Sequence, residues 1–355
     1  MDLSISFNEL PHFPEGVSGR EFLFSNVSFN VSEGEIFGVV GPSGCGKTIL
    51  LKIIAGLIKQ KEGQILKEGV DISYLSPDKR NVSMVFQDIA LYPHLKNLEN
   101  IEFPYVMHNK KENIDLEKIK EIAKLLHIEE EKILSRKPKF SSIGERQRVA
   151  IGKALSYKPD ILLLDEPLSN IEDVLRNEIR HKLKSFIKEH KITTLYVSHN
   201  QRELGIFADE IAVLADKRIQ QIGSYEELYN DPKTFFVSLY IGQLPSNFLT
   251  DSEVSDFTNG KISFYLTIRP DECSLEKQED SIEITGRVNF IEPFIQEEKK
   301  LVCINYKARN FGVLLPLDFN IKLSDLISIY APIKKAKFFT RKSEEELLMR
   351  IYNLW

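Results

Sequence analysis

The segment GPSGCGKT at positions 41–48 constrains this chain more than any other part of its sequence. It matches the phosphate-binding pattern G-x-x-x-x-G-K-[ST], in which glycines let successive backbone N–H groups converge on phosphate oxygens. A β-branched and aromatic run at 35–41 predicts a buried strand before the loop, and an apolar run at 49–58 predicts a helix after it. This strand–loop–helix order predicts a nucleotide-binding α/β domain.

The rest of the first 240 residues continues the alternation of strands and helices. ILLLDEP at 161–167 and TTLYVSH at 193–199 predict two more buried strands. An amphipathic helix is expected between them, and another at 115–128. The residues expected to share the apolar face of the first helix are Leu175, Ile179, Leu183 and Phe186, and those of the second are Leu116, Ile119, Ala123 and Leu126. Such alternation predicts a mostly parallel sheet flanked by helices.

The pattern changes after a polar, turn-rich segment at 242–260. Strict alternation at 261–268 and again at 301–306 predicts an antiparallel sheet or small barrel. The residues expected on the apolar faces of these strands are Ile262, Phe264, Leu266 and Ile268, then Val302, Ile304 and Tyr306. We therefore expect a domain boundary near residue 243, and a short helix at 343–355.

Composition excludes several classes of protein. A net charge of −5 gives no basic excess for nucleic acid. The three cysteines, Cys45, Cys273 and Cys303, are too few and too scattered for a disulfide framework and indicate a reducing cytosol. No apolar run approaches the roughly 20 residues of a spanning helix, and the first ten residues do not resemble a signal peptide. We expect a cytoplasmic protein that reaches a membrane only through partners.

Two adjacent acidic residues complete the predicted nucleotide site. Asp165 and Glu166 follow a buried four-residue apolar run, and open α/β sheets place their ligands at such strand ends. Asp165 suits the shell of a Mg²⁺ ion, and Glu166 suits polarising an attacking water. Lys47 would hold the β- and γ-phosphates, and the Thr48 hydroxyl would bind Mg²⁺.

Five segments in this order, GPSGCGKT, VFQDIALYPHL, SSIGERQRVA, ILLLDEPLSN and YVSHN, resemble the ATP-binding subunit of an ABC transporter. More narrowly, they resemble the ATPase subunits of bacterial importers for sugars, iron or polyamines. The resemblance covers about residues 20–240, and the tail, notably TIRPDECSL, is similar to the regulatory β-domain of that subfamily. It implies an α/β P-loop NTPase with a RecA-like core at 1–242, a helical subdomain at about 88–157, and an OB/TOBE-like all-β domain at 243–355.

The resemblance also implies a role for each matched residue. Glu166, His199 and Gln87 would be catalytic, with His199 contacting the γ-phosphate and Gln87 touching Mg²⁺ beside Thr48 and Asp165. Ser142 and Gly144 would close over a nucleotide held by the opposite subunit. Phe13 is the candidate for stacking on adenine, and a place in the core is the alternative for Phe22. The loop residues implied to bind ATP are Gly41, Pro42, Ser43, Gly44, Cys45, Gly46, Lys47 and Thr48.

Some positions depart from the family pattern, whose signature L-S-G-G-Q stands here as SSIGE. Ile143 replaces a glycine, and a left-handed backbone there would cost on the order of 1–3 kcal/mol. Glu145 would place an anion near a triphosphate unless it points away. Glu172 and Asn200 stand where aspartates are usual. The primary pocket keeps its groups, so we expect an active ATPase with slow turnover, or one that pairs with a different ABC ATPase.

The expected function is the ATP-driven motor of an importer. As a homodimer, or a heterodimer with another ABC ATPase, the chain would drive integral membrane permease subunits and, indirectly, an extracytoplasmic solute-binding protein. A groove at Gln87 and 89–104 would receive a helix of the permease at the inner face of the membrane. NLENIEFP and IGQLPSNFL favour sugar over iron or polyamine as cargo. The alternatives are a soluble ABC ATPase acting on nucleic acid or ribosomes, and a P-loop kinase or GTPase.

Overall fold

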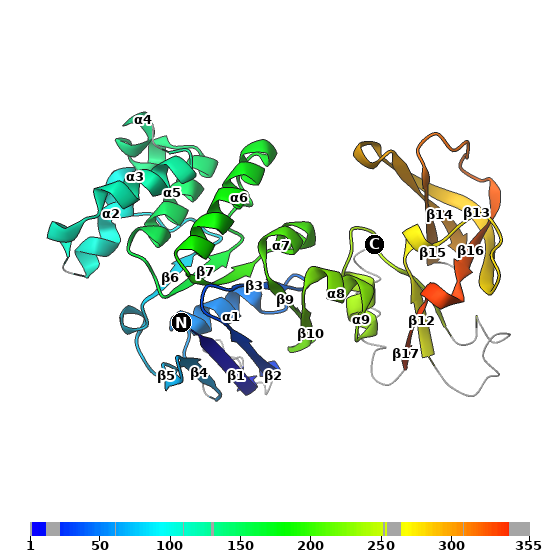
Figure 1. Ribbon diagram of the computed structural model, residues 1–355, viewed down its shortest axis with the longest axis horizontal. Helices are drawn as coiled ribbons and strands as arrows, with labels where there is room; N and C mark the ends of the chain where they lie inside the picture. The colour runs from blue at the N-terminus through cyan, green and yellow to red at the C-terminus, as the bar shows by residue number, and fades with distance from the viewer. Residues whose placement is uncertain are drawn as a thin grey trace. The chain divides into compact units, whose positions relative to one another are not determined.

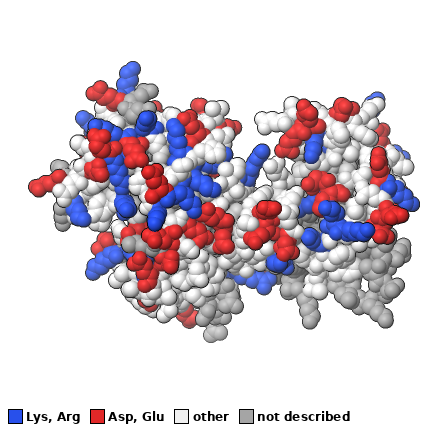
Figure 2. Space-filling view, in the orientation of Figure 1, with Lys and Arg blue, Asp and Glu red and all other residues white. Residues whose placement is uncertain are grey.

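The computed structural model describes residues 2–11, 22–60, 62–108, 110–128, 131–250, 253, 264–307 and 309–340. Its contacts divide the chain into two compact units, residues 1–225 and 226–355. Among the described helices, none is long and apolar enough to cross a membrane. On the face shown in Figure 2, acidic and basic side chains are intermixed over both units.

The first unit is built on a six-stranded sheet in the order β10-β9-β3-β8-β7-β6. The strands from β9 to β6 are parallel, and β10 is antiparallel to β9. The bounds of the sheet strands are β3 Ile36–Val40, β6 Val82–Val85, β7 Ile161–Asp165, β8 Thr193–Val197, β9 Glu210–Ala215 and β10 Arg218–Gly223. Every residue of β3, β7 and β8 is buried, which explains their continuous apolar sequences.

A second, antiparallel sheet in the order β2-β1-β4-β5 belongs to the same unit. Its strands are β1 Leu3–Pro11, β2 Phe22–Val31, β4 Gln64–Lys67 and β5 Val70–Asp71. Helix α1 (Lys47–Ile54) shares one hydrophobic core with both sheets, so the helix that follows the phosphate-binding loop is packed on several sides (Figure 1). The predicted continuation to residue 58 is wrong, because Gly56 takes a φ of 79° and ends the helix.

The remaining helices of this unit form two groups. Helices α2 (Asn97–Met107), α3 (Leu116–Leu125), α4 (Glu131–Leu134) and α5 (Ile143–Ser156) gather beside β6 and β7, whereas α6 (Asp173–Glu189) and α7 (Gln201–Phe207) follow β7 and β8 (Figure 1). Of the four apolar residues predicted for α3, three are buried, but Leu116 is 57% exposed because it is the first residue after the Asp115 cap. The four-helix group occupies most of the segment expected to be a helical subdomain, whose bounds stay a prediction.

The second unit contains the predicted all-β region and two helices. Its sheets have the orders β11-β12-β17 and β15-β14-β13-β16, with antiparallel neighbours throughout. Its helices are α8 Tyr225–Asn230 and α9 Phe235–Tyr240, and its strands are β11 Asn247–Thr250, β12 Phe264–Ile268, β13 Ser281–Phe294, β14 Lys299–Tyr306, β15 Arg309–Pro316, β16 Leu326–Pro332 and β17 Lys337–Thr340. An α/β core followed by a β-rich region confirms the predicted fold class.

Strand β12 differs from its prediction because both of its faces are buried. Leu266 and Ile268 belong to the main core of the second unit, whereas Tyr265 on the other face stacks on Phe235 of α9. This packing places α9 in the second unit, which begins at residue 226, within α8, rather than near residue 243; a functional boundary at 243 stays a prediction. Ile262 and the expected helix at 343–355 lie outside the described residues.

A buried arginine holds the far end of the helix that follows the phosphate-binding loop. Arg80 is 2% exposed, and its guanidinium donates to the carbonyl oxygens of Ile53 at 2.9 Å and Ile54 at 2.8 Å, at the C-terminal end of α1. It also donates to the carbonyl oxygens of Ser73 at 2.6 Å and Leu75 at 2.9 Å. Burial lowers the pKa of Arg80, and the charge of Asp71 opposes that shift. A cation at a helix C-terminus also complements the helix dipole.

We therefore expect Arg80→Met to lower the free energy of unfolding by roughly 3 kcal/mol, because several buried carbonyl groups lose a charged donor. Urea denaturation of the full chain measures this change. Lys79→Met removes a charge from the exposed neighbouring residue and serves as the matched control, with an expected effect within about 0.5 kcal/mol. Equal stabilities for the two variants would contradict the role given to Arg80.

Candidate functional site

The phosphate-binding loop joins β3 to α1 and folds tightly against β9. A Cβ atom added at Gly41 would lie 2.0 Å from the carbonyl oxygen of Leu214, so only glycine fits there. Gly44 and Gly46 take φ values of 79° and 105°, which side-chain-bearing residues rarely adopt. These constraints expose Ser43 and Gly44 to solvent, and the first N–H groups of α1 follow them. The loop thus has the geometry of an anion site at a helix N-terminus.

Lys47 lies over this loop. Its ammonium donates to the carbonyl oxygens of Gly41 at 2.8 Å and Pro42 at 2.9 Å. Both acceptors are backbone groups of the loop itself. The positive charge of Lys47 is therefore held next to the backbone that would surround a phosphate. The predicted loop residues, from Gly41 to Thr48, are therefore brought together as one site.

The acidic pair lies beside the loop at the end of β7. Asp165 is 2% exposed, and Thr48 shares a side-chain hydrogen bond with it. Burial raises the pKa of Asp165 above its usual range; the hydrogen bond with Thr48 lowers it, and the charge of Glu166 raises it further. A hydroxyl oxygen and a carboxylate oxygen are thereby held side by side, as an oxygen-ligated cation requires.

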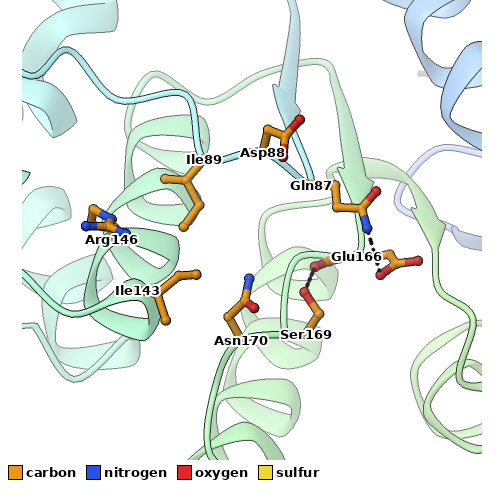
Figure 3. A pocket seen from close by; sticks show the side chains of 8 residues that line it. All are labelled: Gln87, Asp88, Ile89, Ile143, Arg146, Glu166, Ser169 and Asn170. Carbon is orange, nitrogen blue, oxygen red and sulfur yellow. Dashed lines mark hydrogen bonds between the residues drawn. The ribbon is translucent and has the colours of Figure 1, made fainter.

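The carboxylate of Glu166 lies close to the other two residues predicted to be catalytic. Its carboxylate accepts a hydrogen bond of 3.5 Å from Gln87 Nε2 (Figure 3). The same carboxylate lies 3.1 Å from His199 Nδ1. Its backbone is left-handed, with a φ of 48°, and its N–H donates to the carbonyl oxygen of Val197 at 2.9 Å. The ends of β7 and β8 and the segment after β6 thus meet around one carboxylate.

Ser142 and Gly144 lie among residues outside the phosphate-binding loop of their own chain. Ser142 caps α5: its hydroxyl accepts the Glu145 N–H at 3.2 Å, while the Glu145 carboxylate accepts the Ser142 N–H at 2.8 Å. A Cβ on Gly144 would lie 3.0 Å from the carbonyl oxygen of Asn170. None of these partners belongs to the loop at 41–48. The Ser142 hydroxyl still has a proton to donate, because it acts as an acceptor within its own cap.

The structure decides one conditional point about the altered signature and locates Glu145. Ile143 is the first residue of α5 and has no positive φ, so the strain of a left-handed residue is absent. The Glu145 carboxylate completes the capping box with Ser142 and lies 3.5 Å from Arg136, so groups of its own chain set its position. The main remaining difference from the family signature is the side chain of Ile143, which is 51% exposed.

Ile143 lines a cavity of about 620 Å³. Its branched side chain and that of Ile89 extend toward each other from α5 and from the segment after Gln87 (Figure 3). The other residues that line the cavity are Gln87, Asp88, Arg146, Glu166, Ser169 and Asn170. The cavity therefore joins the carboxylate of Glu166 to the start of α5.

The other departures from the family pattern have local structural roles. Asn200 caps α7, accepting the Glu203 N–H at 3.1 Å, so an aspartate is not needed for that cap. Glu172 precedes α6 without a side-chain cap. Phe13 lies outside the described residues, as does the side chain of Phe22, so the residue that stacks on adenine stays a prediction.

Sequence reasoning missed two buried polar contacts at this site. Gln147 joins α5 to the backbone of Glu166 and Asn170, and the Tyr196 hydroxyl donates to Glu203, which ties α7 to β8 just before His199. Burial holds the pKa of Tyr196 well above its usual range. Gln147 lies within the quoted SSIGERQRVA and Tyr196 within YVSHN, but their partners lie 7 to 23 residues further along the chain and outside the same helix or strand, so no periodic pattern indicates the contacts.

Comparison with known proteins agrees with this geometry. The ABC transporter family matches residues 24–169. The trehalose/maltose import ATP-binding protein MalK of Thermococcus litoralis is 38% identical over 285 residues, covering 78% of this chain and 73% of MalK. The osmoprotective compounds uptake ATP-binding protein GgtA of Synechocystis sp. is 39% identical over 343 residues, covering 90% and 94%.

A solved structure shows the same fold in a nucleotide-bound dimer. The ATP-binding cassette MJ0796, in a dimeric post-hydrolysis state bound to ADP and Pi, superposes with a TM-score of 0.54 at 30% identity. The match covers 62% of this chain and 98% of that one. The chain therefore belongs to the ABC transporters, as an ATP-binding and ATP-hydrolysing subunit of the importer type.

Proposed function

We propose that two copies of this chain enclose MgATP between them and drive solute uptake through integral membrane permease subunits. The observation that carries the proposal is the carboxylate of Glu166, which lies beside His199 and Gln87 at the end of β7. The loop from Gly41 to Thr48 of one copy would hold the triphosphate. Ser142 and Gly144, at the start of α5 in the other copy, would cover its γ-phosphate.

Each residue around Glu166 has one task in this proposal. Glu166 orients and polarises the water that attacks the γ-phosphorus, the bond to the bridging oxygen of the β-phosphate breaks, and ADP and phosphate leave. His199 contacts the γ-phosphate, and Lys47 balances its charge. Catalysis is then mostly positioning and electrostatic stabilisation, as in other phosphoryl transfers.

The oxygen groups beside the loop suit Mg²⁺. The side chains of Thr48 and Asp165 are already hydrogen-bonded to each other. With the side-chain amide oxygen of Gln87 they make an all-oxygen set of the kind that this ion prefers. Bound there, Mg²⁺ would neutralise charge on the phosphates. These three residues would hold the ion from one side, and the phosphates would hold it from the other.

The names of the relatives support the proposed cargo and partners. MalK is named for trehalose and maltose import, and GgtA for uptake of osmoprotective compounds, so a sugar or another small solute is the proposed cargo. The chain would act in the cytoplasm, at the inner face of the membrane, with a solute-binding protein on the other side. Iron remains a candidate, since a relative from Fusobacterium nucleatum is named for Fe(3+) import; polyamine remains a candidate from the sequence alone.

Uptake into proteoliposomes tests this function. The full chain is combined with candidate importer permease subunits from the same organism, and accumulation of labelled maltose, trehalose, iron and a polyamine is followed with and without ATP. We expect ATP-dependent uptake of a sugar that stops when Glu166 is changed to Gln. ATP turnover without uptake of any solute would contradict the importer proposal while leaving the ATPase intact.

Ile143 provides a separate prediction about the partner copy. Its exposed side chain would stand where the γ-phosphate of the partner approaches, so Ile143→Gly should raise turnover by about 3- to 10-fold, equivalent to at most ~1.4 kcal/mol of barrier. The free energy of unfolding should fall by up to about 1 kcal/mol, because glycine is a poor helix former. Steady-state ATP hydrolysis by the purified chain measures the rate, and Ile143→Ala should give an intermediate value.

The same measurement separates the homodimer from a heterodimer. If the wild-type chain alone has no turnover, Ile143→Gly does not raise it, and addition of a second ABC ATPase restores it, then the altered signature serves a mixed pair. Turnover by the chain alone that rises with Ile143→Gly supports two identical copies.

A further inference from the structure

Helix α5 carries, at Gln147, a fully buried polar side chain that the proposed mechanism does not use. Gln147 is 0% exposed, and both ends of its amide are paired. Its Nε2 donates to the carbonyl oxygen of Glu166 at 3.0 Å, and its Oε1 accepts the backbone N–H of Asn170 at 3.1 Å. A buried amide is costly unless both ends are paired. Only one orientation of this amide satisfies both partners, so the side chain is fixed.

The backbone that Gln147 contacts belongs to the proposed catalytic carboxylate. Glu166 is a non-glycine residue with a φ of 48°, a conformation that persists only when its surroundings hold it. Four hydrogen bonds do so: its N–H donates to the carbonyl oxygen of Val197, and its own carbonyl accepts from Gln147, from Ser169 Oγ at 3.0 Å and from the Ser169 N–H at 3.3 Å. The direction of the carboxylate toward His199 depends on this backbone.

Gln147 and Gly144 lie three residues apart on α5 and therefore share one face of the helix. Both face Asn170: Gly144 lies against its carbonyl oxygen, and Gln147 accepts its N–H. A Cβ at 144 would be in tight contact with that oxygen, at 3.0 Å, so α5 lies close to the segment 166–170 and Gln147 reaches Glu166. The start of α5 and the backbone of Glu166 are thus one connected unit.

We propose that Gln147 is a positioning residue for ATP hydrolysis, because it fixes the backbone of Glu166 to the helix that starts at Ile143. The proposal rests on the function proposed above for Glu166. Its consequence is that the helix covering the partner's nucleotide and the carboxylate acting on the chain's own nucleotide move together.

Three variants of the full-length chain test the proposal. Gln147→Met keeps the length of the side chain and loses both hydrogen bonds, whereas Gln147→Glu keeps the acceptor for Asn170 and loses the donor to Glu166. Ser169→Ala removes the second side-chain donor to the same carbonyl at an exposed residue and keeps the Ser169 N–H donor, so no buried group is left unpaired. For each variant, kcat and KM for MgATP are measured together with Tm.

For both Gln147 variants, we expect kcat to fall about 10- to 100-fold while KM changes by less than about 3-fold, because a misplacement of about 1 Å can cost about 10²-fold in rate. Ser169→Ala should lower kcat by roughly 3-fold, since Gln147 and the Ser169 N–H still donate to the carbonyl. An unchanged kcat in a folded Gln147→Met chain, or in Ser169→Ala, would overturn the proposal.

Adding Gln147→Met to a chain that lacks the Glu166 carboxylate distinguishes a positioning role of Gln147 from a general structural role. In a Glu166→Gln chain, single-turnover hydrolysis should fall by less than about 3-fold when Gln147→Met is added, because residues that act as one unit are not additive. An equal fold-loss in both backgrounds would show a purely structural role. If Glu166→Gln itself kept full turnover, the proposed function would fail; loss of turnover there, with an unaffected Gln147→Met, would defeat only this inference.

Discussion

Glu166→Gln should lower ATP turnover by about 10²- to 10⁴-fold, the usual cost of losing a general base, and should leave MgATP binding intact. The substitution keeps the size of the side chain and its reach toward Gln87 and His199. It removes the negative charge that would polarise water. The groups that hold phosphate lie on other elements, in the loop and in α1.

Two measurements on the purified chain check this result. Steady-state phosphate release gives the turnover, and equilibrium binding of a fluorescent ATP analogue gives the affinity. Glu172→Gln, at the exposed residue before α6, changes the same chemical group away from the carboxylate cluster and is the matched control. Comparable turnover for the two variants would remove Glu166 from the mechanism.

Gly41→Ala should cost about 3 kcal/mol or more of the free energy of unfolding, because a methyl group does not fit at this position. The new Cβ would lie 2.0 Å from the carbonyl oxygen of Leu214 and 2.8 Å from Cys45 Sγ. The first contact is with the backbone of β9, a fully packed central strand, so the loop has to move instead. ATP affinity should therefore fall together with stability.

Gly69→Ala is the control for this prediction. Gly69 has a φ of 77° but no atom within 4 Å of an added Cβ. Gly69→Ala therefore measures only the cost of a left-handed backbone, which is about 1 kcal/mol of the free energy of unfolding. Thermal unfolding with and without MgATP measures both variants. A Gly41→Ala chain as stable as Gly69→Ala, and still stabilised by MgATP, would contradict the packing described for the loop.

The sequence predicted best those parts of the site that its local order determines. The loop at 41–48 requires glycines at fixed places, and a buried strand delivers Asp165 and Glu166 to one edge of the sheet, so residue spacing alone indicated both. The parallel strands β3, β7 and β8 were predictable for the same reason, since burial on both faces gives continuous apolar runs.

Features that depend on tertiary contacts could not be predicted in this way. The backbone of Ile143 is set by the cap between Ser142 and Glu145, so the family signature alone could not decide whether this residue is strained. The second buried face of β12 depends on α9, which supplies Phe235. Gln147 meets Glu166 across separate elements, and a polar residue in a helix carries no local sign of such a partner.

The most direct measurement is a crystal structure of the Glu166→Gln chain grown with MgATP. Two copies should face each other, with the γ-phosphate within hydrogen-bonding distance of Lys47 in one copy and of Ser142 Oγ and the Gly144 N–H in its mate. Nucleotide bound to Lys47 in a chain whose mate is absent, or with Ile143 of the mate blocking the phosphate, would contradict the shared site.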